Sequence, residues 1–233
     1  MIAENLRRVK ESIEKKCSEV NRNPSEITII AVSKNFSVND INTVFDGGIK
    51  NFGENKAQEL MRKYNELGNK IIWHFIGTLQ RNKVRFAVEA SEYIHSVDSL
   101  LLAMEINKRA EKLNKIQKIL LEIKTSDEET KSGLADESEI SDLAEYCKEY
   151  SNLDLVGLMT MAPFTDDEKK IRGSFRSLRN LRDELNGQGI NMKELSMGMT
   201  NDFLIAVEEG ATMLRIGTAI FGERKYSLEQ DEE

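Results

Sequence analysis

Cysteine is scarce in this sequence, and long apolar runs are missing from it. The two cysteines, Cys17 and Cys147, lie too far apart for a metal-ligand spacing and are too few for a disulfide framework, which favours a reducing cytoplasm. No apolar run approaches the roughly 20 residues of a membrane helix, and the first residues, charged from Glu4 onward, do not resemble an export signal. We therefore expect a soluble cytoplasmic protein with no membrane partner.

An excess of basic residues is also missing. Charged residues make up 31% of the chain and the net charge is −7, so no positive field favours nucleic acid or an anionic membrane. No stretch rich in proline, glycine and serine divides the 233 residues, a length that an α/β barrel commonly occupies as one domain. The sequence predicts a single domain over 1–233, with an N-terminal helix in 1–22 and an acidic tail in 226–233.

Short β-branched apolar runs alternate with amphipathic stretches, which is the pattern of βα units in a parallel sheet. Eight such runs are Ile27–Ser33, Ile49–Phe52, Ile71–Ile76, Tyr93–Val97, Ile116–Ile123, Leu153–Leu158, Glu194–Ser196 and Thr212–Ile216. The clearest amphipathic helices are Asn5–Val20, Leu100–Leu113, Glu139–Tyr150 and Phe175–Leu185. This α/β pattern predicts a single (β/α)8 TIM barrel with an extra N-terminal helix. A doubly wound open sheet uses similar units, and only the count of eight favours the barrel.

A lysine follows the first of these runs directly. Barrel enzymes carry their sites where strands end, and the segment AVSK places Lys34 at such an end. Partial desolvation there disfavours the ammonium form and frees the amine to attack a carbonyl. Lys34 is therefore a candidate for a Schiff base, although a lysine that ends a strand is more often simply solvated.

Two glycine-containing segments lie at the ends of the last two strands. They are SMGMT at 196–200 and RIGT at 215–218, and both combine glycine, hydroxyl groups and backbone N–H groups. A phosphate binds where glycine lets the backbone approach, and barrels often bind it after strands seven and eight. Gly198 and Gly217 could instead form turns only. Two such segments at adjacent strand ends favour the phosphate interpretation.

Polar residues also follow the second and third runs, in FGENKAQE at 52–59 and WHFIGTLQRNK at 73–83. Asn55 is placed to hydrogen-bond a ligand. His74 lies within an apolar strand, so we interpret it as a core histidine satisfied by a hydrogen bond and not as a base. Four methionines occur close to the ends of the sixth and seventh runs. Methionines are more often core residues than pocket residues, and we interpret all four in this way: Met159, Met161, Met197 and Met199.

Several spaced motifs together carry a family resemblance. AVSK, FGEN-xx-QE, WHFIG-x-LQ-x-NK, TSDEETKSG, GLM-x-M, SMGMT-x-D and RIGTAIFG occur in this order between about Ile27 and Arg224. They resemble the pyridoxal phosphate homeostasis protein family, which is similar to the N-terminal domain of alanine racemases. The resemblance implies that Lys34 holds pyridoxal 5'-phosphate (PLP) as a Schiff base. It also implies a cofactor site made by Asn55, Ser196, Gly198, Met199, Thr200, Arg215, Gly217 and Thr218, with Arg215 near the pyridine nitrogen.

This sequence departs from the family pattern at two places. Many members continue AVSK with a second lysine, whereas Asn35, Phe36 and Ser37 follow Lys34 here. Transfer of the cofactor through a neighbouring amine is therefore in doubt. Thr200 stands where serine is usual, and this change preserves the hydroxyl group.

The resemblance favours binding of the cofactor over turnover. Arginine is always charged and donates its hydrogen bonds, so Arg215 would keep the ring nitrogen unprotonated and weaken the ring as an electron sink. We expect no counterpart of the second domain of the larger racemases, which brings them a tyrosine. We expect a monomer or weak homodimer without ordinary turnover that passes PLP to apoenzymes. The alternatives are a small PLP-dependent racemase with His74 or Tyr93 as base, and a phosphate-binding barrel enzyme of sugar or indole metabolism.

Overall fold

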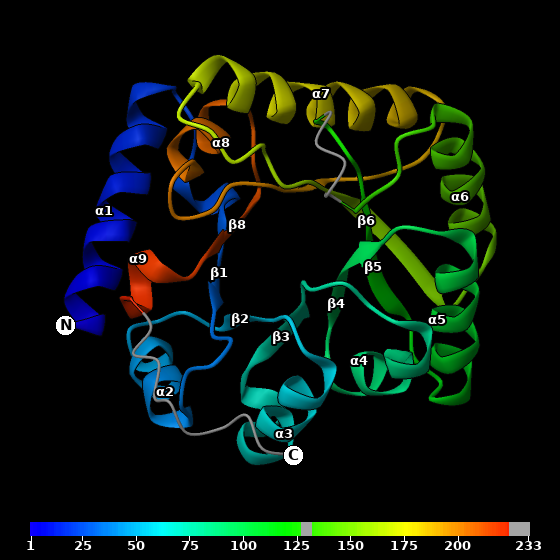
Figure 1. Cartoon of the computed structure of the whole chain (residues 1–233), viewed down its shortest axis with the longest axis horizontal. Helices are drawn as coiled ribbons and strands as arrows, with labels where there is room; N and C mark the ends of the chain where they lie inside the picture. Colours follow the sequence, from blue (N-terminus) through cyan, green and yellow to red (C-terminus); the bar gives the residue numbers. More distant parts are fainter. Residues whose placement is uncertain (127–131, 224–233) are drawn as a thin grey trace.

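Eight parallel strands close into a barrel in the computed structural model of the chain, which describes residues 1–126 and 132–223 (Figure 1). The strands follow one another around the barrel in sequence order, and the last pairs with the first through Ile30 and Arg215. They are β1 (Thr28–Val32), β2 (Asn51–Glu54), β3 (Ile72–Phe75), β4 (Tyr93–Val97), β5 (Gln117–Glu122), β6 (Leu153–Met159), β7 (Glu194–Ser196) and β8 (Met213–Ile216). The predicted barrel is confirmed, and an open sheet is excluded.

The second strand lies later in the sequence than its apolar run indicated. We predicted Ile49–Phe52, whereas β2 runs from Asn51 to Glu54. The reason is pairing: Asn51 lies opposite Ile30 of β1, and Glu54 lies opposite Phe75 of β3. Ile49 precedes the strand and packs in the core outside the ladder.

Helices surround the barrel on its outer side (Figure 1). They are α1 (Ile2–Glu19), α2 (Val38–Asp46), α3 (Ala57–Leu67), α4 (Val84–Ala90), α5 (Leu100–Lys112), α6 (Glu137–Glu149), α7 (Glu168–Gly187), α8 (Phe203–Glu208) and α9 (Thr218–Phe221). Short 3-10 turns are η1 (Pro24–Glu26), η2 (Gly68–Lys70) and η3 (Arg81–Lys83). The predicted N-terminal helix corresponds to α1. Helix α7 begins well before the predicted Phe175, because Asp167 caps it by accepting a hydrogen bond from the Lys169 N–H.

Two predicted features lie outside the described residues, namely the acidic tail at 226–233 and residues 127–131 of the TSDEETKSG motif. Within the described ranges, no helix has both the length and the apolar character of a membrane span. Cys17 and Cys147 are both buried as free thiols.

A small apolar cluster fills the barrel interior, and a larger one lies between the strands and the helices. The inner cluster consists of Ile30, Leu120, Met159 and Met213. The core interpretation is confirmed for Met159 and Met197, which are 1% and 0% exposed. Met161 is partly buried against the inner cluster, whereas Met199 is 38% exposed and is not a core residue.

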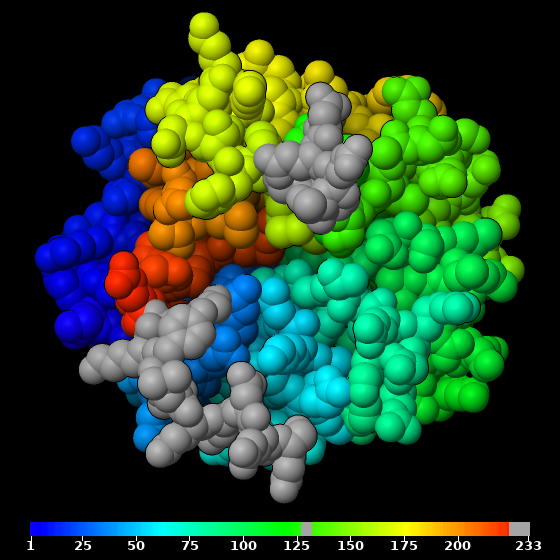
Figure 2. Space-filling view, viewed as in Figure 1, coloured from blue at the N-terminus to red at the C-terminus, as the bar shows by residue number. Residues whose placement is uncertain are grey.

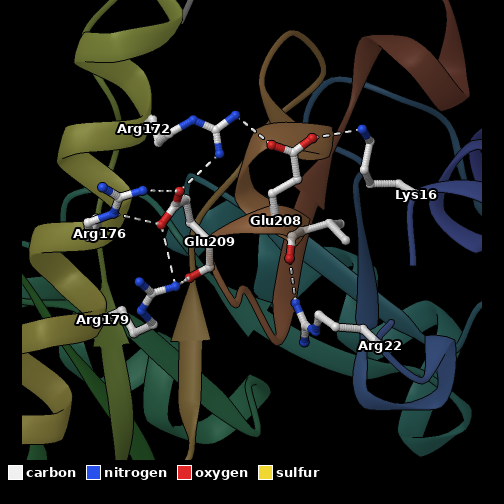
Figure 3. A network of polar contacts seen from close by, with 8 residues as sticks. Lys16, Arg22, Arg172, Arg176, Arg179, Glu208 and Glu209 are labelled. Carbon is white, nitrogen blue, oxygen red and sulfur yellow. Dashed lines mark hydrogen bonds and ion pairs between the residues drawn. The ribbon is translucent and has the colours of Figure 1, made fainter. Parts of the chain in front are cut away.

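A charge network fixes α8, the helix that follows the SMGMT segment (Figure 3). Glu209 is 3% exposed and accepts from Arg172 at 2.9 Å and from Arg176 at 3.0 Å, both on α7. Glu208 pairs with Arg172 and, at 2.7 Å, with Lys16 of α1. Burial opposes ionisation of Glu209, but the arginines outweigh it and lower its pKa. The network therefore ties α1 and α7 to the element that supports a predicted binding loop.

Candidate functional site

Lys34 lies in a tight turn between β1 and α2. Ser33 before it is fully buried, and Asn35 after it has a φ of +66°, a left-handed conformation that asparagine tolerates better than most residues. Phe36 closes the turn by donating its N–H to the Ser33 carbonyl at 3.0 Å. Ser37 then starts α2 with a capping box to Asp40. The turn places Lys34 at the carboxyl end of the barrel, as the sequence predicted.

A buried ion cluster holds the backbone on both sides of Lys34. Lys63 of α3 is 1% exposed and donates to the Ser33 carbonyl at 2.8 Å, to Glu54 Oε1 at 2.7 Å and to Glu59 Oε1 at 2.8 Å. Glu54 also accepts from the Ser33 hydroxyl at 2.6 Å, and Glu59 accepts from the Asn35 N–H at 2.7 Å. Residues 33 and 35 are thus fixed by one lysine and two carboxylates. We call Glu54, Glu59 and Lys63 the anchor cluster.

The two carboxylates of the anchor cluster have opposite pKa shifts. Burial raises the pKa of Glu54, although Lys63 opposes the shift. Burial also acts on Glu59, but the hydrogen bonds from Lys63 and from the Asn35 N–H outweigh it and lower its pKa. Sequence reasoning missed Lys63 and Glu54. The only signal was the spacing of Glu59 and Lys63 by four residues, and such a pair usually lies on a solvated helix face.

The two glycine-containing segments meet at the barrel end. Thr200 Oγ1 accepts from the Ala219 N–H at 3.2 Å and so joins the loop after β7 to the start of α9. Gly198 has a φ of +93°, and a Cβ there would lie 2.5 Å from the Ala206 Cβ, so only glycine fits. Met199 beside it donates its N–H to Asp202 Oδ1. The structure therefore brings together the segments that the sequence predicted to bind phosphate.

Gly217 differs from Gly198 in its backbone conformation and in the room for a side chain. Its φ is −106°, and an added Cβ would meet nothing closer than Val32 Cβ at 3.5 Å, an ordinary contact. Neither the backbone conformation nor protein packing therefore requires glycine here. Thr218 begins α9 next to Gly217 with an N–H group that has no partner within the helix.

Ser196 and Arg215 face the barrel interior and not the loop. The Arg215 guanidinium is 4% exposed and donates to Ser196 Oγ at 2.7 Å and to the Thr160 carbonyl at 2.8 Å. Ser196 is fully buried, and its hydroxyl also lies 2.9 Å from His95 Nδ1. The Ser196 hydroxyl therefore has two partners in the barrel interior, Arg215 and His95. Burial lowers the pKa of Arg215 to about 10, so it stays charged at neutral pH.

Asn55 has an acceptor atom without a partner. Its Oδ1 is buried and has no hydrogen-bond partner among the described residues. Asn55 lines a cavity of about 240 Å³ with Phe75, Thr78 and Lys83, among others. A buried acceptor at this position suits a ligand that donates a hydrogen bond.

His74 is a core histidine, as predicted. It is fully buried, and both of its ring nitrogens have partners, His95 Nε2 at 2.9 Å and Asn51 Oδ1 at 3.0 Å. Burial lowers its pKa to about 3. Tyr93 stacks on this ring with centroids 4.5 Å apart. A histidine with both nitrogens bonded in the interior is a poor candidate for the base of a racemase.

Residues 2–225 match the alanine racemase N-terminal domain family. The pyridoxal phosphate homeostasis protein of Aquifex aeolicus (strain VF5) is 43% identical over 225 residues, which are 96% of this chain and 98% of that protein. The chain belongs to the pyridoxal phosphate homeostasis protein family. The member from Haemophilus influenzae is 37% identical over 235 residues and 99% of each chain.

Solved structures of similar proteins have the same fold as this chain. PipY of Synechococcus elongatus PCC7942, solved with PLP bound, is 34% identical and has a TM-score of 0.83, with 95% of this chain and 100% of PipY covered. An alanine racemase of Clostridium difficile 630 has a TM-score of 0.79 at 16% identity, with 95% of this chain and 57% of the racemase covered. The second comparison shows the shared fold alone. In the space-filling view of Figure 2, segments that are distant in sequence meet near the centre of the face shown.

Proposed function

We propose that the protein binds PLP at the carboxyl end of its barrel and holds it as a Schiff base on Lys34, in the service of intracellular PLP homeostasis. The observation that carries the proposal is the relationship to PipY, which was solved with PLP bound. The names of the relatives from Aquifex aeolicus and Haemophilus influenzae support the homeostasis role.

The residues present fit this cofactor. PLP supplies an aldehyde and a ring that can act as an electron sink. The Lys34 amine attacks the aldehyde carbon, a C=N bond forms and water leaves. The anchor cluster supports this role, because it fixes residues 33 and 35 while the Lys34 side chain reaches the cofactor. Asn55 offers its buried Oδ1 as an acceptor.

The phosphate group is assigned to the two joined loops. Gly198, Met199 and Thr200 form one side, and the backbone of Gly217 and Thr218 forms the other. Support comes from the Thr200 bond that joins the two loops and from the Thr218 N–H group at the start of α9, which has no partner within the helix. Ser196 contributes indirectly in this proposal, because its hydroxyl holds Arg215.

Arg215 favours holding the cofactor over turnover. Its guanidinium donates only and remains charged, so it keeps a facing ring nitrogen unprotonated and disfavours carbanion chemistry. We propose further that the protein is a cytoplasmic monomer or weak homodimer that stores PLP and delivers it to apoenzymes. A small PLP-dependent racemase is the alternative, and deuterium exchange at the α carbon of amino acids in heavy water would reveal it.

Borohydride reduction and peptide mapping test the proposal. We expect the purified protein to absorb visible light, and reduction should fix the cofactor on the peptide that contains Lys34. Lys34→Ala should abolish the label, whereas the control Lys83→Ala, beside the cavity at Asn55, should keep it. A label on Lys83 or on Lys131, which lies outside the described residues, would refute the assignment. A protein without visible absorbance after incubation with PLP would favour a phosphate-binding barrel enzyme in which Lys34 is incidental.

A further inference from the structure

A chain of hydrogen bonds crosses the barrel interior from Arg215 on β8 to Asn51 on β2. Arg215 contacts Ser196 Oγ at 2.7 Å, and Ser196 Oγ lies 2.9 Å from His95 Nδ1. His95 Nε2 lies 2.9 Å from His74 Nδ1, and His74 Nε2 lies 3.0 Å from Asn51 Oδ1. Ser196, His95 and His74 are all fully buried. We call these five residues the interior chain.

The two ends of the interior chain fix the direction of its bonds, because the Arg215 guanidinium can only donate and Asn51 Oδ1 can only accept. Burial keeps both rings neutral, and each must then donate towards Asn51 Oδ1. The Ser196 hydroxyl therefore accepts from Arg215 and gives its own proton to His95 Nδ1. The His95 proton must then be on Nε2, where it is donated to His74 Nδ1. By the same reasoning His74 carries its proton on Nε2 and donates it to Asn51 Oδ1. Both histidines therefore carry their proton on Nε2 and are the same tautomer.

The interior chain also stabilises the Arg215 charge. The two hydrogen bonds of the guanidinium go to neutral oxygens, those of Ser196 and Thr160. Burial lowers the pKa of Arg215, while the charges of Asp202 and Glu122 oppose the shift. Each member of the interior chain turns its acceptor towards the arginine, and aligned hydrogen bonds polarise one another in a low-dielectric interior. The orientation of the guanidinium thus depends on residues that lie as far away as β2.

We infer that His95 and His74 are positioning residues, which hold the Arg215 guanidinium in the orientation that it presents to the cofactor ring. The inference rests on the proposed PLP site. A core role alone would require only that each histidine be buried and satisfied. The interior chain requires more than this. It needs the proton at one defined nitrogen of each ring, and it needs a side chain at position 95 that bonds both Ser196 and His74.

Nitrogen-15 NMR of the histidine rings tests the proton positions without cofactor. The chain contains only two histidines, so the spectrum reports on this pair alone. We expect both rings to be neutral with the proton on Nε2, and to stay so between about pH 8 and pH 5, where exposed histidines titrate. Burial, which keeps both pKa values low, supports this expectation. A proton on Nδ1 of either ring, or a charged ring at pH 5, would overturn the inference.

Two replacements of His95 test the connection to Arg215. Glutamine can accept from Ser196 and donate to His74, whereas leucine can do neither. We expect His95→Gln to bind PLP within about twofold of the native protein and His95→Leu to bind it at least about tenfold more weakly, with a shifted absorption band. Equal affinity and equal spectra for folded His95→Leu and native protein would refute the positioning role.

A second variant covers the case in which His95→Leu does not fold. Asn51→Ala removes the far acceptor, and Asn51 is only partly buried. It should change the His74 NMR signals and weaken PLP binding by about threefold. If Asn51→Ala left both properties unchanged, the interior chain would not act on Arg215. Failure of the PLP site itself is recognised separately, because Lys34 would then remain unlabelled while the histidine spectrum is as expected.

Discussion

Replacing Lys63 with methionine should destabilise the fold strongly. The Lys63 ammonium is 1% exposed and bonds Glu54, which is fully buried, and Glu59, which is mostly buried. Methionine fills much of the same volume but leaves the Glu54 carboxylate in the interior without its cation. Breaking a buried pair in this way costs about 3–5 kcal/mol. For a chain of this size, this corresponds to a Tm decrease of roughly 6–20 °C, at about 2–4 °C for each kcal/mol.

Urea unfolding followed by tryptophan fluorescence measures this loss. Trp73 is the only tryptophan and is 2% exposed, so its emission reports on global unfolding. The matched control is Arg62→Met, which changes an exposed cation on the same helix and should alter stability by less than about 0.5 kcal/mol. The double variant Lys63→Met with Glu54→Gln should recover a large part of the loss, since it leaves no unpaired carboxylate at position 54.

The loss should also depend on pH with a definite sign. The pKa of Glu54 is raised by burial and held down by Lys63, so removing Lys63 raises it further. A carboxyl group with a raised folded pKa binds more protons in the folded than in the unfolded state, and stability then falls as pH rises through that interval. The deficit of Lys63→Met should therefore be larger at about pH 8 than at about pH 5. If the variant unfolds like Arg62→Met at both pH values, Lys63 does not compensate a buried charge.

Two further predictions concern the charge network on α8 and the proposed phosphate loops. Glu209→Gln should cost about 1–3 kcal/mol in urea unfolding, with exposed Glu66→Gln as a neutral control. The pKa of Glu209 is lower in the folded than in the unfolded protein. Its contribution to the free energy of unfolding is therefore present above the unfolded pKa and is lost as the pH falls through the folded pKa. Equal losses of stability in Glu209→Gln at neutral and acidic pH would contradict this prediction. Gly217→Ala should fold normally but bind PLP about tenfold more weakly, whereas Gly198→Ala should be destabilised by steric overlap. Unchanged PLP affinity of Gly217→Ala would place the phosphate elsewhere.

Local sequence patterns were sufficient to predict the architecture. Each strand buries a short apolar run, and each long helix has an apolar stripe, so period and polarity identify both from neighbouring residues alone. The same local reasoning placed Lys34 at a strand end and the two glycine segments at the ends of β7 and β8. The bounds of β2 could not be obtained in this way, because pairing with β1 and β3 determines where a strand begins.

The side-chain partners inside the barrel could not be predicted from the sequence. The bond between His95 and Ser196 joins residues 101 positions apart, and nothing in either local segment indicates the other. Lys63 looks like any charged residue on a helix, yet the packing of α3 against the end of β1 buries it. The sequence determined which segments form the barrel and which polar residues end its strands, since these depend on local periodicity. Only closure of the barrel decided which polar groups share the interior, because that depends on which strands lie opposite one another.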